Sequence, residues 1–149
     1  MAKESVLTPS LENYLEAILY LEKKNKVARV KDIANMLDVQ MPSVTGALKT
    51  LKSKGLIRYE KNSYINLTER GTSIARSVQN RHSIIANFLE RTLGLSPDDA
   101  ERQACQMEHI ISMDTARRIE NLSMYIEEKV LDDSSLTEES WHELLTQKP

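Results

Sequence analysis

The chain has 149 residues, of which 40% are hydrophobic and 28% are charged, and it has one cysteine. That composition is typical of a globular protein with enough sequence for one ordinary domain or two small ones, and a single cysteine excludes an internal disulfide. The first residues lack the apolar core of a signal peptide, and no run reaches the ~20 apolar residues of a membrane helix, so we expect a cytoplasmic protein.

The net charge of -2 divides unevenly along the chain. Residues 1–81 carry 14 Lys and Arg against 8 Asp and Glu, whereas residues 82–149 carry 6 against 14. A basic half joined to an acidic half indicates that the first half binds a polyanion, although an uneven scatter of solvated charges is the simpler alternative.

The basic half has the order of elements of a winged helix-turn-helix. Apolar spacing predicts helices over residues 9–25, 30–37 and 42–54, with a tight link before the third. Two short β-prone runs, 56–60 and 64–67, flank a polar turn and predict a hairpin. A hairpin that follows a reading helix is a wing, so this half is predicted to bind DNA.

The acidic half is predicted to be helical throughout. A long helix should begin at the Leu67-Thr68-x-x-Gly71 junction, continue to about Thr92 and end before Gly94. Apolar spacing and N-terminal Ser, Thr and Pro residues predict three further elements and one acidic loop: helices over 97–111, 112–126 and 137–145, and the loop over 127–135.

One run in the acidic half carries metal-binding side chains. Cys105, Glu108 and His109 stand at positions i, i+3 and i+4 of a predicted helix, so their side chains leave one face. A thiolate, a carboxylate and an imidazole make half of a divalent-metal site. Taken singly, each has a simpler interpretation: a lone cysteine is most often a small buried hydrophobe, and Glu and His are often solvated.

Several separated features together resemble the DtxR/MntR family of metal-dependent (iron or manganese) transcriptional repressors. They are Ser10-x-x-x-Tyr14-x-x-x-Ile18, the winged helix, Arg81-His82 and Cys105-x-x-Glu108-His109. The resemblance implies a mostly α fold, with an N-terminal winged helix-turn-helix that carries a small β-hairpin wing, followed by an all-α dimerisation and metal-binding domain. We place the domains at residues 1–75 and 76–149, and the family's C-terminal SH3-like domain is expected to be absent.

The resemblance also implies a metal site built from three helices. Carried over by position, the ligands are Asn13 and Glu16 from the first helix, His82 from the long helix, and Cys105, Glu108 and His109 from the next. The chain departs from the family at Ala86, where iron-type members have a Glu for an ancillary site. Glu101, one turn before Cys105, is the candidate substitute as a partner of His82.

The ligand types indicate the metal only in part. At the position that corresponds to Asn13, manganese-type members have a carboxylate and iron-type members have Met. At the position that corresponds to Cys105, manganese-type members have Glu and iron-type members have Cys. The soft thiolate favours Fe²⁺, Co²⁺ or Zn²⁺, and the two glutamates favour Mn²⁺ or Fe²⁺. We therefore expect Fe²⁺ or Mn²⁺, with iron preferred, and Co²⁺ or Zn²⁺ as substitutes in vitro.

The predicted partners are palindromic operator DNA and a second copy of the chain, with metal-uptake genes as targets and no membrane or organic substrate. The third helix and the residues just before it should supply most of the DNA contacts, and the hairpin should add Lys61. Base contacts are expected from Gln40, Pro42, Ser43, Thr45 and Gly46, and phosphate contacts from Lys49, Lys52 and Lys61.

Two other functions remain open from the sequence. Three protein ligands with an open position would suit a metallohydrolase, although no spare base or nucleophile stands beside the cluster. A winged-helix regulator could instead respond to a small organic ligand, and Cys105, Glu108 and His109 would then have only a structural role.

Overall fold

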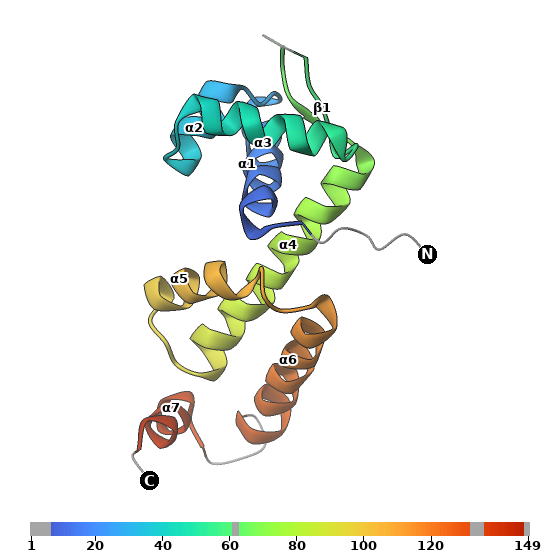
Figure 1. Cartoon of the computed structure of the whole chain (residues 1–149). Coiled ribbons are helices and arrows are strands. Elements are labelled where there is room, and N and C mark those ends of the chain that lie inside the picture. Colours follow the sequence, from blue (N-terminus) through green and yellow to red (C-terminus); the bar gives the residue numbers. More distant parts are fainter. Residues whose placement is uncertain (1–6, 61–62, 132–135, 148–149) are drawn as a thin grey trace. The chain divides into compact units, whose positions relative to one another are not determined.

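The computed structural model describes residues 7–60, 63–131 and 136–147, and it divides into two compact units after Val78. Figure 1 shows the elements of both in chain order: α1 (Pro9–Asn25), α2 (Val30–Leu37), α3 (Met41–Ser53), β1 (Ile57–Arg58), β2 (Asn66–Leu67), α4 (Glu69–Asn87), η1 (Phe88–Thr92), α5 (Pro97–Met107), α6 (Met113–Ile126), η2 (Glu127–Leu131) and α7 (Glu138–Thr146). The predicted mostly α fold class with a small two-stranded sheet is confirmed.

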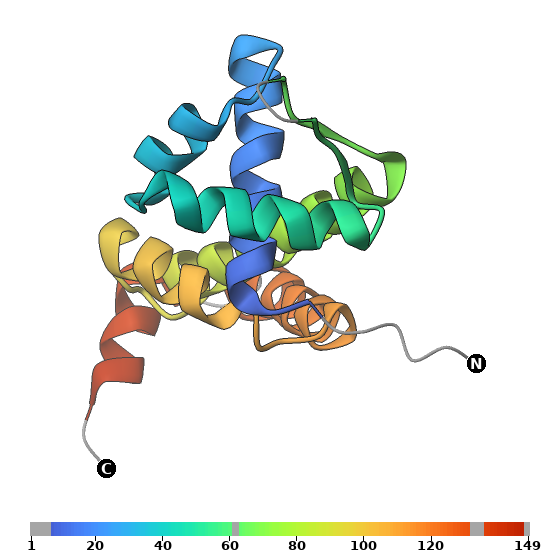
Figure 2. The same ribbon diagram turned by 45° about the horizontal axis from the view of Figure 1, so that its top comes forward.

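The first unit packs three helices and a hairpin around one apolar core. Figure 2 shows α3 lying across α1, with α2 beside them. The largest fully buried side chains of this core come from all of these elements: Leu15, Ile18, Ile33, Val44, Leu48, Leu51, Leu56 and Ile65. Because the apolar stripes of α1 and α3 converge on the same core, the outer face of α3 remains exposed to solvent.

The predicted helix-turn-helix is present, and its turn depends on one backbone conformation. Asp38 follows α2 with φ 52°, and its N–H donates to the carbonyl of Ala34. Aspartate tolerates this left-handed conformation better than most residues do, so it can end α2 within one residue. Gln40 then precedes α3 with an extended backbone, and Pro42 occupies the first turn of that helix.

The hairpin is short and is held at three places. Ile57 pairs with Leu67 in an antiparallel register, and a single bridge joins Ile65 to Ala28. At the start of α4, Thr68 Oγ1 donates to the carbonyl of Gly55 and accepts from the N–H of Gly71. These bonds fasten both ends of the hairpin to the helical core. The tip residues 61 and 62 lie outside the described residues, and so does the predicted DNA contact of Lys61.

The second unit differs from the expected pattern at two π-turns. The long helix is α-helical only to Asn87, and its last five residues form η1. Gly94 then adopts φ 73°, a conformation that glycine accepts without steric cost, and the chain reverses. Residues 127–131, expected as a loop, instead extend α6 as a second π-turn, η2. The rest of that predicted loop, 132–135, lies outside the described residues.

The last helix packs against the end of η1. Trp141 Nε1 donates to the carbonyl of Thr92 at 2.8 Å, and His142 Nε2 lies 2.9 Å from the carbonyl of Arg91. The His142 ring approaches Gly94 so closely that an added Cβ would lie 2.5 Å from it. The side chains of α7 thus satisfy backbone carbonyls at the end of η1.

The close packing at Gly71 gives a stability prediction. A Cβ at this position would overlap the backbone carbonyl of Leu56, which the hairpin holds in place. We expect Gly71→Ala to lower the free energy of unfolding by about 1–3 kcal/mol. Gly46→Ala is the matched control, because that site on α3 has open space, and the change should stabilise by up to ~1 kcal/mol. Urea denaturation of both variants measures the difference, and equal midpoints would contradict this account.

Candidate metal centre

The second unit brings five metal-type side chains together from α4 and the α5 region. His82 lies on α4, Glu101 and Cys105 lie on α5, and Glu108 and His109 follow directly after it. The donor atoms of His82, Glu101 and Cys105 lie within 4.8 Å of one another. The structure therefore juxtaposes all the predicted ligands of this unit, including Glu101.

The end of α5 departs from the predicted helix. Its last helical residue is Met107, Glu108 is the C-cap with φ -58° and ψ -30°, and His109 lies in the turn beyond. The Glu108 N–H still donates to the carbonyl of Ala104, so Cys105 and Glu108 keep helical spacing. His109 takes its direction from the turn rather than from a continuous helix face.

His82 is at the centre of the cluster. Its Nδ1 lies 2.6 Å from Glu108 Oε2 and its Nε2 lies 2.9 Å from Glu101 Oε2. The Cys105 Sγ lies 3.9 Å from the same Nδ1. Imidazole, thiolate and carboxylate are all ligands of divalent transition metals, and donor atoms this close can share one ion or two neighbouring ions.

Glu108 is the most constrained member of the cluster. It is 3% exposed and is the one charged residue buried to this extent in the described part of the chain. Its Oε1 lies 3.2 Å from His109 Nε2, and its Oε2 pairs with His82. A buried carboxylate is costly unless it is paired, so these two imidazoles compensate it.

The electrostatics of the cluster favour a protonated His82. The pKa of His82 rises to about 9, and the largest cause is its hydrogen bond to Glu108. Burial lowers the pKa, whereas the hydrogen bond to Glu101 raises it further. A divalent ion that takes His82 as a ligand must therefore displace a proton.

One supporting residue had no assigned role in the sequence. Arg81 Nε donates to the backbone carbonyl of Glu108 at 2.7 Å, which fixes the turn that carries Glu108 and His109. The Arg81-His82 pair in the sequence could have drawn attention to Arg81, but sequence spacing does not show that it contacts the Glu108 carbonyl.

The two other predicted ligands lie in the first unit. Asn13 and Glu16 are on α1, one turn apart, with Asn13 exposed and Glu16 partly buried. Helical spacing places them on one side of α1. Their assignment as ligands remains a prediction.

Most of the residues on and just before α3 that are predicted to contact DNA are exposed to solvent. Gln40, Pro42, Ser43, Gly46, Lys49 and Lys52 are exposed, and Thr45 is half-buried. The Thr45 hydroxyl donates to the carbonyl of Met41 at 3.1 Å, which leaves its methyl group and oxygen lone pairs for a ligand. Whether these residues contact bases remains a prediction.

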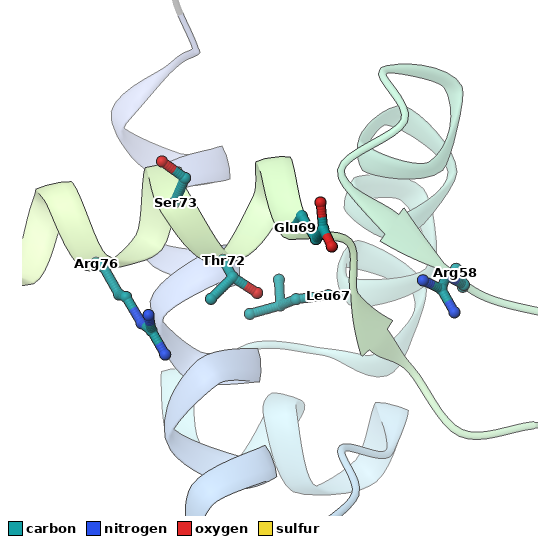
Figure 3. Close-up of a pocket in the computed structure, with 6 residues that line it drawn as sticks. All are labelled: Arg58, Leu67, Glu69, Thr72, Ser73 and Arg76. Carbon is teal, nitrogen blue, oxygen red and sulfur yellow. The ribbon is translucent and has the colours of Figure 1, made fainter.

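A cavity of about 440 Å³ in the first unit is not a second centre of this kind. Figure 3 shows Arg58 on β1 and Arg76 on α4 at opposite ends of it, with Glu69, Thr72 and Ser73 between them. Glu69 is its one carboxylate, and the two guanidinium groups do not converge. The cavity therefore lacks a metal-ligand set.

Family comparisons agree with this arrangement. The sequence model of the iron dependent repressor N-terminal DNA binding domain matches residues 6–64, and that of the iron dependent repressor metal binding and dimerisation domain matches residues 68–136. The chain belongs to the iron-dependent repressor family. This family consists of transcriptional repressors, so the chain is a DNA-binding regulator and not an enzyme.

Three relatives illustrate the family's range. The chain is 36% identical to the HTH-type transcriptional regulator MntR of Geobacillus kaustophilus over 81% of this chain and 85% of that protein. It is 30% identical to the iron-dependent repressor IdeR of Mycobacterium tuberculosis over 76% of this chain and 49% of that protein. The structure of the manganese regulator SloR superposes with a TM-score of 0.69 and 28% identity, over 80% of this chain and 55% of that one.

The chain thus spans about half the length of two of these relatives. IdeR is an iron-dependent repressor and SloR is a manganese regulator, so these relatives alone do not identify the metal of this chain. No helix in the described ranges combines the length and apolar character needed to cross a membrane.

The pKa of His82 predicts how the stability of the metal-free protein depends on pH. A folded pKa of about 9 against 6.5 means that the protonated imidazole stabilises the fold below about pH 6.5, and that this contribution is lost as the pH rises through about 9. The difference in urea midpoint between the wild type and His82→Gln should therefore shrink between about pH 6 and pH 10. A difference that stays constant over this range would contradict the pairing of His82 with Glu108.

Proposed function

We propose that the chain is a metal-activated repressor that binds a palindromic operator as a homodimer and represses metal-uptake genes when loaded with Fe²⁺ or Mn²⁺. The convergence of His82, Cys105, Glu108 and His109 in one unit carries the proposal, because this family pairs a DNA-binding domain with a metal-binding and dimerisation domain.

In the proposed mechanism, metal controls DNA binding because one ion is bound by side chains from both units. His82, Cys105, Glu108 and His109, with Glu101 as an added partner of His82, supply the second unit's share. Asn13 and Glu16 on α1 are proposed to complete the set. An ion shared in this way links the two units, and a coupling of ~1–3 kcal/mol is enough to change DNA affinity by 5–150-fold. By the same linkage, operator DNA must tighten metal binding equally.

The fit of the residues to a divalent ion follows from their chemistry. Two glutamates, two imidazoles and one thiol lie close together in the second unit, and the Cys105 thiol is exposed, so an ion can reach it from solvent. The thiolate favours iron over manganese, whereas Glu108 and Glu16 are compatible with both. We propose Fe²⁺ as the preferred ion, with Mn²⁺ as the close competitor.

The DNA contacts follow from the exposed face of α3. A dimer presents two reading helices to successive major grooves, ~34–36 Å or a multiple apart, which suits a palindrome. The proposed base contacts are Gln40, Pro42, Ser43, Thr45 and Gly46, and the proposed phosphate contacts are Lys49, Lys52 and Lys61. Gly46 offers no side chain to a base, so the positions beside it should carry the sequence preference.

Replacement of the thiol tests the function. A duplex of about 30 base pairs, selected from a random-sequence pool on the metal-loaded wild type, serves as operator. Under anaerobic conditions, which protect the exposed thiol, added Fe²⁺ or Mn²⁺ should tighten wild-type binding 5–150-fold. Cys105→Ala should lose this gain, whereas Gln106→Ala, a change at the next exposed position, should keep it. A Cys105→Ala variant that binds as tightly and responds as strongly as the wild type would exclude this site.

Conversion of the thiol to a carboxylate tests the choice of metal. Cys105→Glu replaces a soft ligand with a hard one at the same position, so the ratio of Fe²⁺ to Mn²⁺ affinity should fall, by about tenfold if the thiolate binds the ion directly. Isothermal titration of the metal-free protein with each ion measures the ratio. An unchanged ratio would show that Cys105 does not select the metal.

A further inference from the structure

A second concave feature of the first unit lies between the start of α3 and the hairpin. This feature, the wing groove, has a volume of about 490 Å³. Eight residues define it: Arg29, Val30, Lys31, Met41, Thr45, Tyr59, Ser63 and Tyr64. All eight belong to one compact unit. Of these, only Thr45 is among the DNA contacts proposed above.

The wing groove combines a cationic rim with an apolar wall. Arg29 and Lys31 supply two positive charges, and none of the described residues that line the groove is acidic. Met41 and Tyr64 are 53% and 50% exposed, so both side chains offer apolar surface to a ligand in the groove. A nucleotide unit has the complementary composition, because a charged phosphate is joined to a largely apolar deoxyribose.

Arg29 is held in place before any ligand arrives. Its guanidinium lies over the Tyr64 ring, 5.1 Å from the centroid, and donates to the Tyr64 hydroxyl at 3.3 Å. The neighbouring residues are joined through the backbone, since the Ile65 N–H donates to the carbonyl of Ala28 at 3.0 Å. Among the described residues no carboxylate pairs with Arg29, so its charge is available to an anion.

The groove is continuous with the reading helix. Met41 is the first residue of α3 and directly precedes Pro42 and Ser43, and Thr45 lies one turn further on. A DNA strand whose bases meet the start of α3 therefore passes the groove with its backbone. The opposite wall, Tyr59, Ser63 and Tyr64, belongs to the hairpin.

We propose that the wing groove binds one phosphate and its deoxyribose from the operator strand beside the bases that α3 contacts. Arg29 and Lys31 bind the phosphate, Met41 and the Tyr64 ring pack on the sugar, and Tyr64 is a positioning residue for Arg29. The proposal rests on the proposed function, because it takes operator DNA as the ligand. It adds contacts that are independent of sequence and that fix the register of α3 on the duplex.

A phosphate scan on the selected duplex of about 30 base pairs tests the groove. Single phosphates are replaced by neutral methylphosphonates, and the affinity of the full-length, Mn²⁺-loaded protein is measured for each. One position per half-site should weaken the wild type strongly and Arg29→Gln much less, because that variant keeps Lys31 but has already lost the Arg29 contact. Arg29→Gln should also bind about tenfold to thirtyfold more weakly at 0.15 M salt, with the salt slope smaller by about 0.9 for each subunit.

Three further variants separate the groove from general charge and folding effects. Lys24→Ala removes the same charge from another cation–aromatic pair, that of Lys24 and Tyr20 outside the groove, and should keep the wild-type phosphate response. Tyr64→Phe keeps the ring and should keep most of the response, whereas Tyr64→Leu should weaken it at the same phosphate. Urea midpoints and metal affinity equal to the wild type show that a variant is folded.

The outcomes distinguish this proposal from the function on which it rests. A wild type that selects no duplex in the presence of metal overturns the proposed function. A wild type that binds with metal, while Arg29→Gln keeps its full response at every phosphate, overturns the wing groove alone. A salt slope of Arg29→Gln equal to that of Lys24→Ala would likewise overturn it.

Discussion

The second unit depends on the compensation of one buried carboxylate. Glu108 is nearly inaccessible to water, and it is paired through one oxygen with His82 and through the other with His109. An unpaired carboxylate there would destabilise the fold, so α4 and the end of α5 must bring both imidazoles to it. The same requirement brings together the side chains that are proposed to bind a divalent ion, so the proposed function uses the contacts that stabilise the fold.

The geometry of this pairing is held by the backbone around it. Because α5 ends at Met107, Glu108 and His109 lie in a turn, and Arg81 fixes that turn through the Glu108 carbonyl. Arg81 and His82 are consecutive, so α4 provides one residue to the backbone and one to the side chain of Glu108. If His82 binds the ion as proposed, α4 connects the ion directly to the turn that carries Glu108 and His109.

In the first unit, the main constraint is that α3 must bury one face in the core and keep the opposite face exposed. The left-handed Asp38 allows α2 to end and α3 to begin within three residues. Gly71 allows the backbone of Leu56 to approach α4, which fastens the hairpin beside α3. Arg29 and Tyr64 then join the start of α2 to the hairpin, and the wing groove results from this junction.

The sequence by itself determined the helices, the helix-turn-helix and three candidate ligands, because apolar periodicity and the Cys105-x-x-Glu108-His109 spacing are local properties of the chain. The other candidate ligands came from the family resemblance. Tertiary structure alone decided where α5 ends, that π-turns close α4 and α6, and that α7 packs on Gly94. It also decided that Arg29 reaches Tyr64 across 35 residues, and it brought Glu101 to His82 across 19, a contact that the sequence only suggested. These features depend on contacts between distant segments, which no local pattern specifies.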